Sequence, residues 1–181
     1  MVCILQTFAT HAQDRFIVTP SRFEIPERGL VDSLDIFENT NIFSIIPPTG
    51  WRLRFDPAQK QINFISTNQA TSISIKFAET NAALVPIPEL EALQAEVVAR
   101  FPGGKVVSHF RSVTGMVPGE GFDVRWRAST GYLLQTRLSL VPYASGTIEI
   151  SLTGSPESTE AERRVYTGLL NSLSRLAPTR R

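Results

Sequence analysis

Short stretches in which apolar and polar side chains alternate, separated by tight turns, constrain the fold of this chain more than any other feature. Residues 51–55 read Trp-Arg-Leu-Arg-Phe, and residues 72–77 alternate in the same way. A period of two residues is typical of a strand with one buried face. Strands are likewise predicted at 43–46, 61–66, 105–113, 121–128, 132–141 and 147–153. Tight turns between successive strands predict an antiparallel meander.

Two helices interrupt this pattern. The first is predicted over residues 88–101, where Pro88 suits the first helical position and Glu89 and Glu91 suit the positive end of the helix dipole. Its buried stripe is predicted to be Leu90, Leu93, Val97 and Phe101.

The second helix is predicted over residues 155–176 and opens at Ser155-Pro156. Thr159 and Glu162 have the spacing of a capping box. Gly168 lowers helix propensity, which predicts close packing against the sheet at that point. The order is therefore ββββ-α-ββββ-α, an α+β fold with a single antiparallel sheet of about six to eight strands and helices on it.

A length of 181 residues fits one domain. We assign that domain to residues 41–176 and a short tail to 177–181. Residues 13–40 are interrupted by Pro20, Pro26 and Gly29. They are interpreted as a loosely packed lead-in segment with a short strand at 16–18 and a short helix between 28 and 39.

The first twelve residues bear on the compartment. Residues 1–12 are mostly apolar and end in Thr10-His11-Ala12, with small residues at the positions that a signal peptidase prefers, although a basic start is missing. We interpret them as the remnant of a signal peptide that begins upstream; the alternative is the frayed start of a cytoplasmic protein. Export to a periplasmic or extracellular location is favoured, and no later segment is apolar enough to cross a membrane.

Composition excludes several function classes. Lys and Arg number 18 against 17 Asp and Glu, so the net charge is +1 and no overall field attracts nucleic acid. The single cysteine, Cys3, rules out an internal disulfide and a cysteine-based zinc site. With only His11 and His109 as histidines, no metal and no cofactor is expected.

Residues 43–51, Phe-Ser-Ile-Ile-Pro-Pro-Thr-Gly-Trp, resemble the opening signature of the PsbP/Mog-like superfamily. Residues 169–173, Leu-Leu-Asn-Ser-Leu, are similar to the pattern that ends its last helix. The resemblance covers roughly residues 41–176 and implies an antiparallel sheet sandwiched by helices. It also implies a scaffold or binding module, such as the exported bacterial DcrB-like members, rather than an enzyme. No functional residue carries over from it.

A group of basic residues has the parity opposite to the apolar residues of each strand. If the apolar residues share one face, the other face gathers Arg52, Arg54, Lys76, His109, Arg111, Arg125, Arg127 and Arg137. Arginine binds carboxylates and phosphates through its planar fork, so this face is a candidate surface for an anionic ligand or a protein partner. The other interpretation is a solvated face that keeps the strands soluble.

Catalysis has weaker support. His109 lies beside Arg111 with no evident carboxylate to orient it, so it is not expected to act as a base. Asp123 and Glu149 have outward parity and, on one face, allow a small hydrolase that uses carboxylates. The Gly-rich residues 115–121 join two strands and are predicted to be a hairpin loop rather than a phosphate-binding loop.

The leading hypothesis is therefore a non-catalytic binding domain for a protein or an anionic ligand. The alternatives are the carboxylate hydrolase and an assembly or chaperone-like factor for an envelope complex. Oligomeric state and pathway are left open by the sequence.

Overall fold

The computed structural model describes residues 15–26, 29–79, 90–144 and 146–176. The signal-peptide interpretation of residues 1–12, the tail at 177–181 and the predicted helix start at Pro88 lie outside them. Within these ranges, no helix has the length and apolar character needed to cross a membrane.

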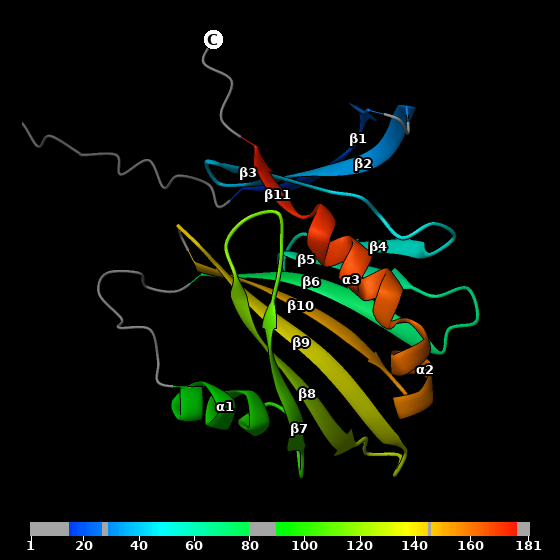
Figure 1. The fold of residues 1–181 in the computed structure, drawn as a ribbon, viewed down its shortest axis with the longest axis vertical. Coiled ribbons are helices and arrows are strands. Elements are labelled where there is room, and N and C mark those ends of the chain that lie inside the picture. Colours follow the sequence, from blue (N-terminus) through cyan, green and yellow to red (C-terminus); the bar gives the residue numbers. More distant parts are fainter. Residues whose placement is uncertain (1–14, 27–28, 80–89, 145, 177–181) are drawn as a thin grey trace, which may run out of the picture.

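Two antiparallel sheets dominate the described part of the chain (Figure 1). The large sheet has the order β4 (Arg52–Asp56), β5 (Gln61–Ile65), β6 (Thr71–Glu79), β10 (Gly146–Gly154), β9 (Leu133–Tyr143), β8 (Gly119–Arg127), β7 (Lys105–Ser112). The small sheet has the order β1 (Phe16–Ile25), β2 (Gly29–Glu38), β3 (Asn41–Ile45), β11 (Ser174–Leu176). The α+β class and the antiparallel pairing are confirmed. The large sheet has seven strands, within the predicted range, but the predicted strand at 43–46 belongs to the second sheet, which was not anticipated.

The segment interpreted as a loose lead-in is instead a hairpin of the small sheet. Strands β1 and β2 pair from Phe16 with Glu38 to Ile25 with Gly29, and Gly29 has a φ of +74° that few other residues adopt. The predicted short helix is wrong because Leu30, Leu34 and Phe37 fall at helical spacing by coincidence. In the strand, Leu34 is buried in the core and Phe37 lies on the opposite side.

The core lies between the two sheets. We call the side of each sheet that faces the other its inner side and the opposite side its outer side. Phe43 of β3 is fully buried, and its ring centroid lies 5.2 Å from that of Phe77 in β6 and 5.4 Å from that of Tyr143 in β9. Aromatic pairs at such distances add to the hydrophobic stabilisation, so the strand that carries the family resemblance also joins the two sheets.

In the described part of the chain, three helices cover the large sheet on both sides (Figure 1). Helices α2 (Pro156–Ala161) and α3 (Arg163–Ser172) lie on the inner side, where the hydroxyl of Tyr166 is 2.8 Å from both the Ile150 carbonyl and Ser139 Oγ. Burial raises the pKa of Tyr166, so its hydroxyl keeps the proton that it donates to the carbonyl. Helix α1 (Leu90–Ala99) lies on the outer side, with Val97 packed in a second core cluster.

The C-terminal helix opens as predicted but ends earlier. Ser155 caps α2 through a hydrogen bond from the backbone N–H of Ser158 to Ser155 Oγ (3.1 Å), with Pro156 at the first turn. A break at Glu162 separates α2 from α3, so the predicted capping box within one long helix is wrong. Leu176 belongs to β11 rather than to the helix.

Gly168 does not pack closely on the sheet, contrary to the sequence prediction. Apart from the backbone of its own helix, a Cβ atom built at this position meets no heavy atom of the described residues within 4 Å. Because glycine in a helix interior costs about 0.5–1 kcal/mol relative to alanine, we expect Gly168→Ala to raise the free energy of unfolding by about that amount. Urea denaturation measures the effect, and a loss of stability would show that this face of α3 has a neighbour.

Candidate functional site

The predicted basic face divides between the two sides of the large sheet. Ile75 points to the inner side and pairs with Ile150, which pairs with Ser139. Arg137 lies two residues before Ser139 on the same strand, so it also points inward. Its cross-strand partner Asp123 points inward with it. By the same registers the inner residues of the basic set are Arg125, Arg127 and Arg137, and the outer ones are Arg52, Arg54, Lys76, His109 and Arg111. The assumption of one apolar face is wrong because β6 buries its inner side against the small sheet, whereas β8 buries its Phe122 side against α1.

The guanidinium of Arg137 is held by contacts within the protein. Its Nη1 donates to both carboxylate oxygens of Asp123 (3.0 and 2.8 Å), and its Cζ lies 3.7 Å above the centroid of the Phe110 ring. Ser108 Oγ donates to the same carboxylate at 2.5 Å. Since the Asp123 side chain is only 5% exposed, this arrangement is a buried structural ion pair and not a free binding group.

Arg125, Arg127 and His109 also have hydrogen-bond partners within the protein. Arg125 donates from Nε to Gln135 Oε1 (3.0 Å), and Arg127 donates from Nη1 to the Gly131 carbonyl (3.1 Å). His109 has the carboxylate neighbour that the sequence did not reveal, because its Nε2 lies 2.7 Å from Glu120 Oε2. The pair links the edge strand β7 to β8, and both side chains are partly exposed, so it is a surface interaction.

The two carboxylates proposed for a hydrolase lie on opposite sides of the sheet. Asp123 points inward, whereas Glu149 pairs with Leu140 on the outer side and contacts Arg100, just after α1. Two carboxylates on opposite sides cannot flank one glycosidic bond. This alternative is therefore contradicted by the register of the strands.

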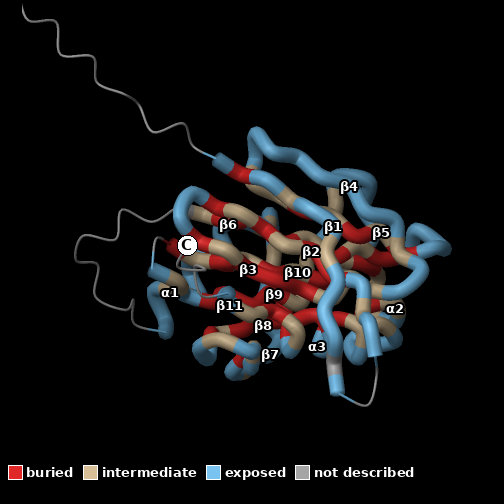
Figure 2. Tube along the Cα trace, turned by 90° about the horizontal axis from the view of Figure 1, so that it is seen from above, coloured by how far each residue is buried: buried red, intermediate tan, exposed pale blue. Residues whose placement is uncertain are grey.

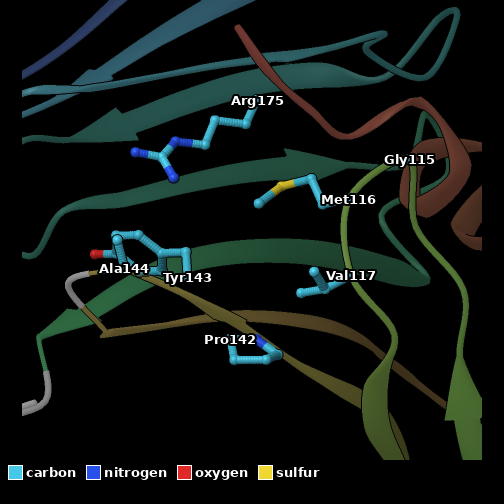
Figure 3. A pocket seen from close by; sticks show the side chains of 7 residues that line it. All are labelled: Gly115, Met116, Val117, Pro142, Tyr143, Ala144 and Arg175. Carbon is cyan, nitrogen blue, oxygen red and sulfur yellow. The ribbon is translucent and has the colours of Figure 1, made fainter. Parts of the chain in front are cut away.

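A pocket of about 490 Å³ opens instead between the β7–β8 loop, the end of β9 and β11 (Figure 3). We call it the loop pocket. Its lining consists of Gly115, Met116, Val117, Pro142, Tyr143, Ala144 and Arg175. Its volume falls within the range of small-molecule sites, and a mostly apolar lining with few polar groups is typical of them.

The loop that forms one wall is held in place by local contacts. The Thr114 hydroxyl accepts a hydrogen bond from the N–H of Met116 and donates one to the carbonyl of Val117, both at 3.1 Å. At Gly115 a Cβ atom would lie 2.7 Å from the carbonyl oxygen of Leu173, so only glycine lets the loop approach the end of α3 this closely. The predicted hairpin loop is thus present, and it forms part of a wall.

Arg175 supplies the charge of the loop pocket (Figure 3). Its Nη2 donates to Asn41 Oδ1 at 2.8 Å, and Asn41 in turn donates to the buried carboxylate of Glu38 at 3.2 Å. That carboxylate is also 3.4 Å from Lys60 Nζ. Within the described residues no carboxylate forms an ion pair with Arg175, which leaves its positive charge available at the pocket.

The sequence alone does not reveal this site, because its local patterns predict a helix at Arg175 and a hairpin loop at residues 115–117. The signal lies in the long-range pairing of Arg175 with Phe43, which places β11 beside β3. No local pattern reveals such a pairing.

No protein-family model and no curated protein sequence matches the chain. Among solved structures, LpqN of Mycobacterium tuberculosis, which is involved in cell envelope biogenesis, matches 94% of this chain and 98% of its own with a TM-score of 0.59 and 11% identity. The Ran-binding protein Mog1p of Saccharomyces cerevisiae matches 83% and 85% (TM-score 0.47, 12% identity). The cyanobacterial PsbP of Synechocystis matches 87% and 93% (TM-score 0.47, 12% identity).

At such identities, likeness to a solved structure concerns the fold alone. The match to LpqN therefore shows that this chain shares its fold.

Proposed function

We propose that the protein is a non-catalytic binding domain and that the loop pocket takes a small amphipathic anion. One observation carries the proposal: a guanidinium without a carboxylate partner among the described residues lines a mostly apolar pocket. A carboxylate, sulfonate or phosphate pairs with the guanidinium through charge-assisted hydrogen bonds. An attached hydrocarbon chain then contacts Met116, Val117 and Pro142.

The lining supports binding rather than turnover. Its seven residues include no serine, cysteine, histidine, aspartate or glutamate, the side chains that most often act as nucleophiles or general bases. An anionic ligand is also what the sequence predicts. The difference is that Arg175 binds it in the loop pocket, rather than the basic residues on the face of the sheet.

Titration calorimetry with decanoate tests this proposal, with decanol as the uncharged control. We expect decanoate to bind, decanol to bind at least tenfold more weakly, and Arg175→Gln to weaken decanoate binding by about tenfold or more, since hydrogen bonds to charged groups contribute about 1.5–3 kcal/mol. Glutamine retains a donor for Asn41, which preserves the local packing.

The matched control is Arg127→Gln, because Arg127 is an exposed arginine that contacts only a loop carbonyl among the described residues. It should leave the affinity for decanoate unchanged. Equal affinities of the wild type and Arg175→Gln would contradict the proposal, as would equal binding of decanol and decanoate.

We also propose that the protein is exported. The support is the small-residue pattern at 10–12 and the role of LpqN in cell envelope biogenesis. In an envelope, ionised fatty acids and anionic lipids are amphipathic anions of the proposed class. An assembly factor for an envelope complex remains the alternative role, with a protein segment in the same pocket. N-terminal sequencing of the protein from its native host tests export, and an intact residue 1 would contradict it.

A further inference from the structure

A second pocket, of about 260 Å³, lies on the outer side of the small sheet and has a different chemistry. Its lining consists of Ser21, Phe23, Ser33, Asp35, Ser44, Ser174 and Leu176. We call it the serine pocket. In Figure 2 the molecule is seen from above, where β1, β2, β3 and β11 lie.

Strand pairing brings these side chains together from all four strands. Asp35 of β2 pairs with Ser44 of β3, and Ser44 pairs with Ser174 of β11. In the adjacent outward row, Ser21 of β1 pairs with Ser33 of β2. Along each strand these residues alternate with residues that point into the core, so their side chains all lie on the outer side of the sheet. Because the serine side chains are small, they leave space for the pocket.

Ser33 is the first sign that the pocket takes a ligand. The residue is only 2% exposed, yet its hydroxyl has no hydrogen-bond partner among the described residues. Buried polar groups are almost always paired, and an unpaired one costs about 1–3 kcal/mol. A ligand with a polar group in the pocket supplies the missing partner.

The carboxylate of Asp35 indicates that the ligand carries a positive charge. The carboxylate is half-buried, and within the described residues no cation pairs with it. The neighbouring outward residues of the four strands are uncharged: Ile17, Thr19, Ser21, Phe23, Val31, Ser33, Phe37, Ile42, Ser44, Ser174 and Leu176. A half-buried carboxylate without a counter-charge favours a cation in its pocket.

We propose that the serine pocket binds a small molecule that carries a protonated primary amine. An ammonium group has three donors and no acceptor, which matches one carboxylate surrounded by hydroxyl oxygens. Phe23 and Leu176 also line the pocket and offer apolar contact to an attached carbon chain. The two pockets thus bind ligands of opposite charge on different parts of the molecule.

The test uses butylammonium chloride, with butanol as the uncharged analogue and methyl glucoside as a neutral polyol. Proton–nitrogen NMR spectra of the full chain follow each titration. We expect butylammonium to shift the amide signals of Ser33, Asp35, Ser44 and Ser174, and butanol and methyl glucoside to leave them in place. Asp35→Asn should weaken butylammonium binding by at least tenfold.

Asp32→Asn is the matched control, because Asp32 is a neighbouring exposed carboxylate that pairs with Arg22 on the surface. It should bind butylammonium as the wild type does. Absence of butylammonium binding, equal binding by Asp35→Asn, or stronger binding of methyl glucoside would each overturn the proposal. Because the loop pocket is tested separately with decanoate, failure of one assignment leaves the other intact.

Discussion

Replacing Arg137 by methionine is expected to lower the free energy of unfolding by about 3 kcal/mol or more, because it leaves the buried carboxylate of Asp123 without its counter-ion. The pair is mostly buried, with side-chain exposures of 16% for Arg137 and 5% for Asp123. Ser108 continues to donate to Asp123, and Arg163 lies 3.9 Å from it, which places the loss at the lower end of the range for broken buried pairs. Urea denaturation at neutral pH measures the change.

Two further variants separate this explanation from a general loss of packing. Arg127→Met removes an exposed arginine and should change stability by about 0.5 kcal/mol or less. The double variant Asp123→Asn, Arg137→Met removes both charges and should recover more than half of the loss. If Arg137→Met alone lowers the free energy of unfolding by less than about 0.5 kcal/mol, Arg137 does not form a buried ion pair. The result would then support the solvated basic face that the sequence predicts.

Phe43→Ala is expected to lower the free energy of unfolding by about 3–5 kcal/mol, the cost of a large cavity in a well-packed core. Phe43 is fully buried and contacts aromatic rings of two strands in the large sheet, Phe77 and Tyr143. Because Tyr143 also lines the loop pocket, the variant should bind decanoate more weakly as well. Thermal and urea unfolding measure the stability, and calorimetry measures the binding.

Phe55→Ala is the comparison, since Phe55 is partly exposed on the edge strand β4 and contacts one ring, that of Phe16. Its loss should be less than half that of Phe43→Ala. Similar losses for the two variants would mean that the two sheets are not joined through Phe43.

Much of the fold was predictable because its signals are local. Alternation at 51–55 and 72–77, the Ser155-Pro156 helix start and the tight turns each depend on neighbouring residues, and the corresponding elements are present. The hairpin of β1 and β2 was missed because prolines and a coincidental helical spacing obscured its alternation. The second sheet was missed because the pairing of β3 with β11 joins residues more than a hundred positions apart.

The site was less predictable for the same physical reason. Which side of a strand is buried depends on the element packed against it, and this changes between β6 and β8. Arg137 has the spacing of a solvated residue and yet forms a buried ion pair, whereas Arg175 lies in a predicted helix and yet lines a pocket. Charge parity along a single strand therefore identified basic residues but not the surface that they form.

The central claim is that the loop pocket takes the charged end of an amphipathic anion at Arg175. The most direct measurement is a proton–nitrogen NMR titration of the full chain with decanoate. The account predicts that the shifted amide signals lie at residues 115–117, at 143 and 144 and at Arg175, and that Arg175→Gln removes them. Shifts confined to the strands that carry Arg52, Arg54 and Lys76, or shifts that persist in Arg175→Gln, would contradict it.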